Sequence, residues 1–308
     1  MPNRALLALA RSDRARDLAL QLPATRAMVR RFVPGETRTA AVEVAAGLVA
    51  EGLRVTLDRL GEDTTERRHA HRVEAEYAAL LGELARRGLA RHTEVSVKLT
   101  ALGLRLPGGE EIATMHARSI CETARTAGTT VTLDMEDHTV TAATLRVLRA
   151  LRAEFPETGG VLQAYLRRTP ADCRTLSGPG SRIRLCKGAY DEPADVAFAS
   201  RHEVDLSYVA CLRTLLAGEG YPMVATHDPR IIAIARHLAE RHGRVPGDHE
   251  FQMLYGVRPD EQRRLAAEGE TVRVYLPYGE EWWGYLTRRL AERPANLSFF
   301  VRSLLSSS

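Results

Sequence analysis

The chain contains almost no lysine. Of its 43 Lys and Arg residues only two are lysine, Lys98 and Lys187, although lysine is normally among the commonest residues of soluble proteins. Each lysine ends a short apolar run of the kind that forms a β-strand, 94–98 and 182–187. An ammonium is a compact, strongly hydrated charge that a planar guanidinium does not replace. We therefore expect both lysines to belong to a site at strand ends.

Other scarcities exclude whole classes of protein. No CxxC spacing occurs, which argues against a disulfide framework and a structural zinc site and fits a reducing cytoplasm. No apolar run approaches the ~18 residues that span a bilayer, and the run at 5–10 is too short for a secretory signal. Aromatic residues are 6% of the chain and no basic block accompanies the net charge of +4, so nucleic acid is not an expected partner.

From residue 53 onward, short β-branched runs alternate with longer amphipathic runs. Eight of the short runs predict strands: Leu53–Leu57, Val95–Lys98, Thr130–Asp134, Val161–Tyr165, Ile183–Cys186, Pro222–Thr226, Phe251–Leu254 and Val272–Leu276. Helical patterns lie between them over 66–87, 110–127, 142–153, 203–217, 230–242, 261–268 and 281–292. This alternation predicts an α/β fold, a closed (β/α)8 barrel of the TIM type. The main rival, a doubly wound sheet, usually carries an early glycine-rich phosphate loop, and no GxGxxG or GxxxxGK[ST] occurs.

The first fifty residues read as helix throughout, up to Gly52. We expect two parts: an N-terminal helical segment, 1–52, packed on a catalytic barrel, 53–308.

Successive residues of a strand face opposite sides, which divides each run into an outer and an inner set. The outer set is apolar: Leu133, Leu162, Ile183, Leu185, Val272 and Val274. The inner set is polar: Asp134, Gln163, Tyr165, Arg182, Arg184, Thr226, Gln252, Arg273 and Tyr275. Because buried charges without partners are costly, these groups need each other or a ligand. Several cations with few carboxylates favour an anionic partner.

Individual residues leave alternatives open. Lys187 and Arg184 are three residues apart, so on one regular strand their side chains point to opposite faces. Both reach one pocket only if the strand ends or bulges near Cys186. The acidic run 134–138 could bind a metal, but it lacks Cys and His ligand spacing; a solvated loop is the better interpretation, and no metal is expected. His227 could be a ligand, a base or the neighbour of a helix cap.

Three further short motifs complete the candidates. Asp228 before Pro229 indicates an N-cap with proline at the first helical position. Arg288 and Arg289 point about 100° apart on the last helix, so at least one of them could be a solvated surface arginine. The pair Trp282–Trp283 is typical of core packing.

Eight fragments in order carry a family resemblance. They are Ser-Val-Lys98-Leu, Leu-Asp134-Met-Glu, Gln163-Ala-Tyr-Leu, Arg184-Leu-Cys-Lys187-Gly-Ala-Tyr190, Ala-Thr226-His227-Asp, Glu250-Phe-Gln-Met-Leu254-Tyr-Gly, Tyr275-Leu-Pro-Tyr-Gly and Tyr-Leu-Thr-Arg288-Arg289-Leu-Ala-Glu. Together they resemble proline dehydrogenase in its compact monofunctional bacterial form, from about residue 53 to residue 300. The resemblance implies a distorted barrel that holds FAD and oxidises L-proline to 1-pyrroline-5-carboxylate by hydride transfer from C5 to flavin N5. It also implies a membrane quinone as electron acceptor.

The resemblance implies roles by matching position. FAD would contact Met135, Gln163, Arg184, Lys187, Gly188, Ala189, Thr226 and His227. The proline carboxylate would be held by Lys98, Arg288 and Arg289. The same match makes Asp134 and Arg184 catalytic: Asp134 would orient the cations, and Arg184 would stabilise charge on the reduced flavin. The substrate ring would be enclosed by Ala189, Tyr190, Leu254 and Tyr275. No general base is assigned.

The resemblance also implies a cellular setting: cytoplasmic, with peripheral contact at the inner face of the membrane, and a 1-pyrroline-5-carboxylate dehydrogenase as the next enzyme. Two departures limit the transfer. Asp191 stands where larger bifunctional relatives carry tryptophan, and Leu276-Pro277-Tyr278-Gly279 replaces Ala-Pro-Val-Gly. Two other hypotheses stay open: a Schiff-base lyase with Lys98 or Lys187 as nucleophile, and a barrel that binds anions without catalysis.

Overall fold

The computed structural model describes the backbone of residues 31–292 and the side chains of residues 31–287. Eight parallel strands close into a barrel in chain order, with β1 hydrogen-bonded to both β2 and β8. The strands are β1 (Arg54–Arg59), β2 (Thr93–Val97), β3 (Val131–Leu133), β4 (Gly159–Gln163), β5 (Arg182–Cys186), β6 (Tyr221–Ala225), β7 (Glu250–Leu254) and β8 (Val272–Tyr278). The predicted (β/α)8 fold is confirmed, and each predicted strand overlaps an observed one.

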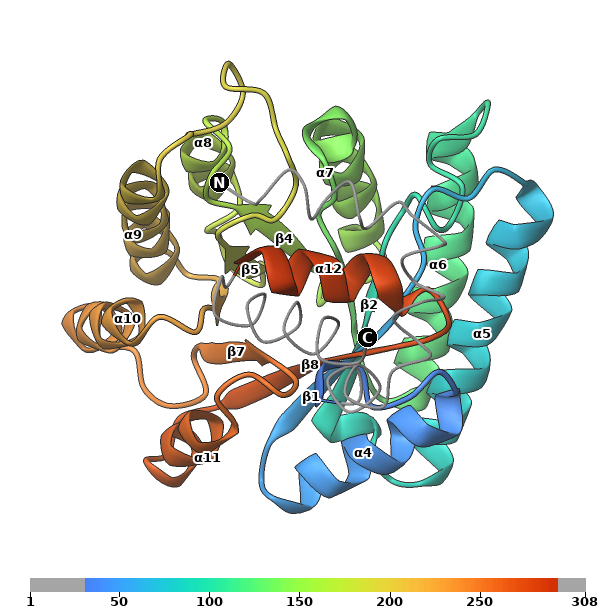
Figure 1. Ribbon diagram of the computed structural model, residues 1–308, viewed down its shortest axis with the longest axis horizontal. Helices are drawn as coiled ribbons and strands as arrows, with labels where there is room; N and C mark the ends of the chain where they lie inside the picture. The colour runs from blue at the N-terminus through green and yellow to red at the C-terminus, as the bar shows by residue number, and fades with distance from the viewer. Residues whose placement is uncertain (1–30, 293–308) are drawn as a thin grey trace, which may run out of the picture.

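Helices α4 to α11 surround the barrel in the order in which the chain makes them, and α12 lies across it (Figure 1). They are α4 (Arg38–Ala50), α5 (Arg67–Arg86), the short 3-10 helix η1 (Ala90–His92), α6 (Gly109–Ala127), α7 (His138–Arg152), α8 (Thr169–Thr175), α9 (Arg201–Ala217), α10 (Pro229–Arg241), α11 (Pro259–Ala267) and α12 (Trp282–Glu292). Among these helices the periodicity does not indicate α8 or η1, because seven and three residues are too few to show a repeat.

Capping side chains explain where several helices begin. The Asp228 side chain accepts a hydrogen bond from the Arg230 amide at 3.0 Å, and Pro229 takes the first helical position of α10, as predicted. Ser200 and Glu203 form a reciprocal capping box at the start of α9. Each cap satisfies amides that the helix itself leaves unpaired. The caps therefore fix the turns that follow the carboxyl ends of the strands.

The N-terminal expectation is partly wrong. Residues 33–37 are not helical, because Pro34 has no amide hydrogen to donate and disfavours helical backbone at the residue before it. Helix α4 follows, and its Ala41, Val42 and Ala45 pack in one cluster with barrel residues such as Val55. Residues 1–30 lie outside the described part of the chain, so the boundary at 52 stays a prediction.

The outer faces of the strands form the core beneath the helices. Leu133 packs in one large cluster, and Leu162, Ile183, Leu185, Val272 and Val274 pack in a second. All six side chains are buried, which confirms the predicted outer set. Truncating a buried leucine of this kind to alanine typically costs about 2–5 kcal/mol. All four cysteines are free thiols.

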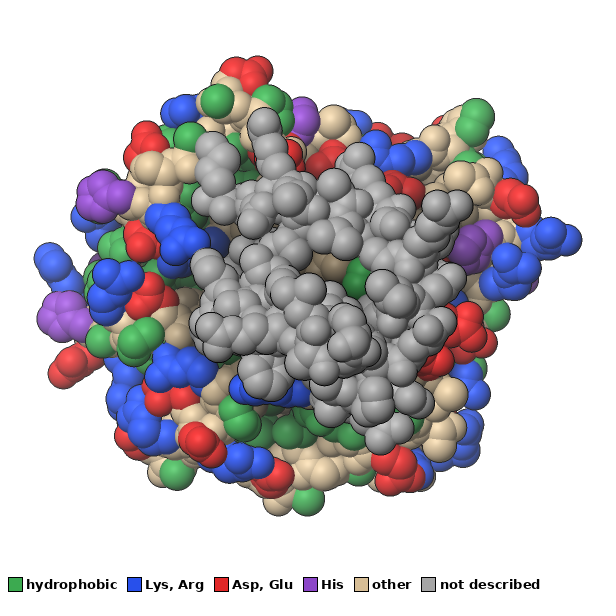
Figure 2. Space-filling model, viewed as in Figure 1, with side chains coloured by type: hydrophobic (Ala, Val, Ile, Leu, Met, Phe, Trp, Pro, Cys, Tyr) green, Lys and Arg blue, Asp and Glu red, His purple; other side chains and the backbone are tan. Residues whose placement is uncertain are grey.

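The helix α12 lies across the barrel in the view of Figure 1. Its Trp282, Trp283, Tyr285 and Leu286 form a cluster with Phe32, Val33 and Leu60, so the predicted core role of the two tryptophans is confirmed. Leu60 follows β1, which places this aromatic cluster at the carboxyl ends of the strands. Around it, Figure 2 shows cationic and anionic side chains interspersed over the described part of this face. Within the described residues, no helix is long and apolar enough to cross a membrane.

Candidate active site

Arg184 on β5 is the centre of the polar interior. Its guanidinium donates to Asp134 Oδ1 at 2.7 Å, to Ser96 Oγ at 3.0 Å, to Glu94 Oε1 at 3.2 Å and to Gln252 Oε1 at 2.5 Å. Burial opposes the charge, but Asp134 and Glu94 outweigh it and raise the pKa of Arg184 further. Partners from β2, β7 and the end of β3 therefore fix one cation in orientation as well as in charge.

Asp134, directly after β3, joins this cation to Tyr275 on β8. The Tyr275 hydroxyl donates to Asp134 Oδ2 at 2.7 Å, and the Arg184 guanidinium lies 5.2 Å from the centre of the Tyr275 ring. Burial and the negative charge of Asp134 raise the pKa of Tyr275 well above its ordinary value, so its hydroxyl stays protonated. Arg184, Asp134 and Tyr275 therefore lie together at the barrel mouth, as predicted.

Lys98, directly after β2, has a partner that the sequence analysis missed. Its ammonium lies 2.7 Å from each carboxylate oxygen of Asp58 on β1, and both side chains are buried. Burial works against the ammonium, but the charges of Asp58 and Asp134 raise the pKa of Lys98 above its usual range. A protonated amine is not a nucleophile, which counts against a Schiff-base lyase at this position.

The expected excess of positive charge inside the barrel was wrong. Glu94 on β2 contacts Arg182 at 2.9 Å as well as Arg184, and Glu250 on β7 accepts from Arg273 at 2.7 Å and 3.1 Å. Burial raises the pKa of Glu94, but Arg273, Arg182 and Arg184 together hold it well below its usual range. Four cations thus meet four carboxylates, a set we call the interior charge network: Lys98, Arg182, Arg184 and Arg273 with Asp58, Glu94, Asp134 and Glu250.

The missing carboxylates had a signal in the sequence. Glu94 lies two residues before Ser96 and shares its parity, and Asp58 alternates with the outward Val55 and Leu57. The predicted strand ends at Leu57, one residue before Asp58, whereas the observed β1 continues to Arg59.

The acidic run after β3 is not a solvated loop. Besides Asp134, Glu136 is buried and accepts from the Thr100 amide at 3.0 Å and from the Thr100 hydroxyl. Burial raises the pKa of Glu136 to about 7 in spite of these hydrogen bonds. Asp137 instead caps α7 through the Thr139 amide at 2.9 Å. Each carboxylate of the run therefore has a different protein partner.

The segment after β5 confirms one expectation and corrects another. The strand ends at Cys186 as required, yet Lys187 points to Asp205 on α9 at 2.5 Å and lies 3.7 Å from Asp228, away from the partners of Arg184. Gly188 follows with φ +111°, and a Cβ there would lie 2.2 Å from the Tyr165 ring. Tyr165 itself was placed wrongly: it lies beyond β4 in a small cluster with Leu166 and Ala197, because β4 ends at Gln163.

The remaining predicted residues lie at neighbouring strand ends. Gln163 donates to the Glu136 carbonyl at 2.8 Å. Met135, which precedes Glu136 in the sequence, is buried. The Thr226 hydroxyl accepts from the Asp228 amide at 3.1 Å, and His227 Nε2 accepts from the Leu254 amide at 2.9 Å. The second bond makes His227 a support of the β7 end, with an unprotonated Nε2.

A half-buried strip runs along these strand ends while the strand residues beneath it are mostly buried. It contains Lys187, Gly188, Ala189, Tyr190, His227, Leu254 and Tyr275. The strip contains both polar and apolar side chains, and the Arg184 guanidinium lies 5.2 Å from the ring of Tyr275, one of its members. Such a strip fits a flat cofactor with a polar edge, because the ligand would cover the apolar atoms and meet the hydrogen-bonding groups.

Arg288 and Arg289 lie in the backbone of α12, as predicted. Their side chains fall outside the described residues. The aromatic cluster fixes the first half of this helix.

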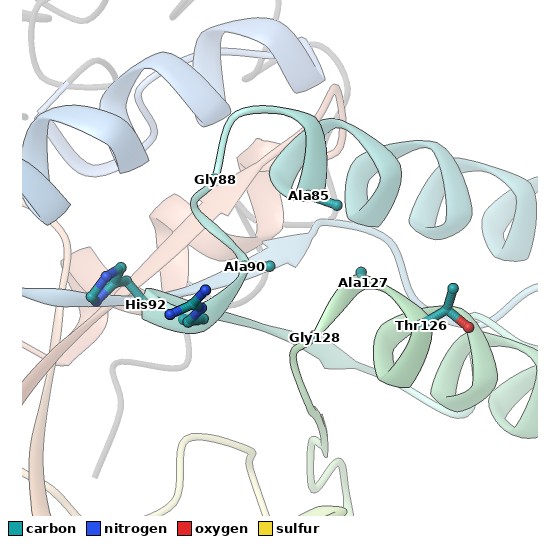
Figure 3. Close-up of a pocket in the computed structure, with 8 residues that line it drawn as sticks. Ala85, Gly88, Ala90, His92, Thr126, Ala127 and Gly128 are labelled. Atoms are coloured by element: carbon teal, nitrogen blue, oxygen red, sulfur yellow. The ribbon is translucent and has the colours of Figure 1, made fainter.

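A hollow of about 470 Å³ lies at the opposite end of the barrel (Figure 3). Ala85 of α5, Ala90 of η1 and Ala127 of α6 line it with glycines and Thr126. A larger hollow at the same end, about 860 Å³, includes Arg182 and Arg273, which are already paired with carboxylates. The amino-terminal face of such barrels generally serves stability rather than catalysis. The carboxyl ends therefore remain the candidate active site.

A closed (β/α)8 barrel with a charged cluster at the carboxyl ends of its strands defines the class of barrel enzymes. The comparisons with known proteins go further. The family model described as proline dehydrogenase matches residues 41–302, and the chain belongs to this family. It is an oxidoreductase, and its relatives support proline as the compound oxidised.

Two relatives illustrate the similarity. Proline dehydrogenase 1 of Bacillus subtilis is 41% identical over 91% of this chain and 92% of its own length. Proline dehydrogenase of Deinococcus radiodurans is 39% identical over 90% of each chain. The crystal structure of proline utilization A from Bdellovibrio bacteriovorus superposes with a TM-score of 0.80 at 28% identity, over 86% of this chain and 32% of that larger one. Within that protein the chain corresponds to about a third of the length.

Proposed function

We propose that this chain is an FAD-dependent enzyme that oxidises L-proline to 1-pyrroline-5-carboxylate and passes the electrons to a quinone. Family membership supports the substrate. The observation that carries the chemistry is Arg184, which is held by four partners and lies 5.2 Å from the ring of Tyr275 in the half-buried strip. A rigid cation in a dry site stabilises negative charge that develops above it, because no reorganisation is needed at the moment of reaction.

The strip at the strand ends would hold the cofactor. We assign Met135, Gln163, Arg184, Lys187, Gly188, Ala189, Thr226 and His227 to it. FAD, when bound, supplies at its N5 atom the acceptor for the hydride that leaves proline C5. Lys187 would belong to this set by its place directly after β5, although its ammonium points to Asp205 and Asp228. Gly188 lets the backbone approach closely, since no side chain fits beside Tyr165.

The substrate carboxylate would be held by Arg288, Arg289 and Lys98. Lys98 is already neutralised by Asp58, so the two arginines of α12 provide most of the net attraction for an anion. Asp134 would position the cluster through Arg184 and Tyr275. Tyr275, with Ala189, Tyr190 and Leu254, would enclose the ring of proline. Two electrons leave with the C5 hydride and one proton leaves the ring nitrogen, which yields the cyclic imine.

The cellular setting follows from the acceptor. A quinone dissolved in a membrane requires contact with the membrane surface, so we propose peripheral attachment at its inner face. The imine product would pass to a 1-pyrroline-5-carboxylate dehydrogenase.

Absorption of the purified protein tests the proposal. We expect a yellow protein with a flavin band that L-proline bleaches without oxygen, and that a quinone restores. A colourless protein that borohydride traps covalently with a carbonyl substrate would support a lyase instead. A colourless protein that is not trapped would support an anion-binding barrel.

A further inference from the structure

A group of three potential metal ligands lies between α5 and α6, outside the barrel. His71 and Glu74 lie three residues apart on α5, which brings them to one face of the helix. His116 faces them from α6, which packs alongside α5 (Figure 1). One ligand atom from each residue lies within 4.8 Å of the other two.

The distances suit a metal ion after small movements. Glu74 Oε2 lies 2.5 Å from His116 Nδ1 and 3.8 Å from His71 Nδ1. Ligands about 2.0–2.2 Å from a tetrahedral Zn²⁺ lie roughly 3.3 Å from one another. On binding zinc, the distance from Glu74 to His116 would increase and the distance from Glu74 to His71 would decrease, each by less than about 1 Å. His71 can move freely because 74% of its side chain is exposed.

The surroundings orient the central ligand. The Ser119 hydroxyl of α6 donates to Glu74 Oε1 and leaves Oε2 toward the two imidazoles. Carboxylates that ligate a metal are usually held by such an outer hydrogen bond. His116 is fixed by burial, with 6% of its side chain exposed, whereas the His71 side is open to water. The arrangement provides three protein ligands and one position for water.

We propose that His71, Glu74 and His116 bind one divalent transition-metal ion, zinc in particular, and that this ion fastens α5 to α6. Two imidazoles and one carboxylate suit zinc and its neighbours rather than Mg²⁺ or Ca²⁺, which prefer oxygen ligands only. Within the described residues, no other set of three His, Cys, Asp or Glu residues brings its ligand atoms within 4.8 Å of one another. This site is independent of the proposed proline oxidation.

Calorimetric titration of the full-length protein with ZnCl₂, after treatment with a chelator, tests the site. We expect one ion per chain, and no binding of MgCl₂. The variants His71→Ala and Glu74→Gln should bind zinc at least about tenfold more weakly, since even outer supports of metal sites are worth 10–100-fold. Removal of exposed His71 does not endanger folding. His237→Ala, an exposed histidine of α10, is the matched control and should bind like the wild type.

Thermal unfolding gives the second measurement. Zinc should raise the unfolding temperature of the wild type and of His237→Ala, because an ion that binds only the folded state stabilises it. It should not raise that of His71→Ala. The proposal is overturned if the wild type binds no zinc, or if either ligand variant binds it as tightly as the wild type. In that case Glu74 serves only as a hydrogen-bond partner of His116 and Ser119.

Discussion

Lys98 and Asp58 form a buried ion pair, with both carboxylate oxygens 2.7 Å from the ammonium. Removing one member of such a pair leaves the other charge buried without compensation. We predict that Asp58→Asn lowers the free energy of unfolding by about 3–5 kcal/mol, measured by denaturant titration. The double variant Asp58→Asn with Lys98→Met should recover most of this loss. Equal stability of the single and double variants would contradict the pairing.

The arginines of α12 carry the next prediction. Arg288→Met and Arg289→Met should each raise KM for proline by roughly 10–100-fold and lower kcat, because a hydrogen bond to a charged group contributes about 1.5–3 kcal/mol. Steady-state kinetics together with the flavin content would measure this. FAD should stay bound, and Arg213→Met, an exposed arginine of α9, should behave like the wild type. Loss of flavin with unchanged proline affinity would reverse our division of roles.

Glu136 links stability to pH. Its pKa is raised by burial to about 7 in the folded state, from 4.5 in the unfolded chain. The folded protein therefore binds the extra proton between these values, and the resulting stability is present below pH 4.5 and lost as pH rises through 7. Glu136→Gln removes this loss. Relative to the wild type, the variant should gain about 2–3 kcal/mol between pH 5 and pH 8. A stability difference that is constant over this range would refute the assignment.

Gly188 and Gly178 offer a matched pair. Alanine at 188 would take an unfavourable φ of +111° and place its Cβ 2.2 Å from the Tyr165 ring, whereas a Cβ at Gly178 would meet nothing within 4 Å. Strain and overpacking each cost about 1–3 kcal/mol. We expect Gly188→Ala to lose at least about 2 kcal/mol of unfolding free energy and Gly178→Ala to lose almost none. Similar losses in both variants would rule out this packing account.

The sequence was a good guide to the barrel because hydrophobic alternation is local. Strand β5, for example, could be read from Ile183 and Leu185 alone. Its interior partners could not, because Arg184 and Glu94 are 90 residues apart and meet only when the barrel closes. The strand alternation predicted that Arg184 and Asp134 point inward, but not that Glu94 also contacts Arg184. The alternation rule fails at Lys187, because the chain leaves the sheet after Cys186. There the side chain is directed by its contact with Asp205 of α9.

The aromatic cluster has a consequence for genetics. Phe32, Val33 and Leu60 hold the first half of α12, the helix that carries Arg288 and Arg289. A screen for variants that grow poorly on scarce proline would therefore find substitutions at these three positions alongside those at the two arginines. Although distant in the gene and without a proposed contact to proline, they would appear as one epistatic group.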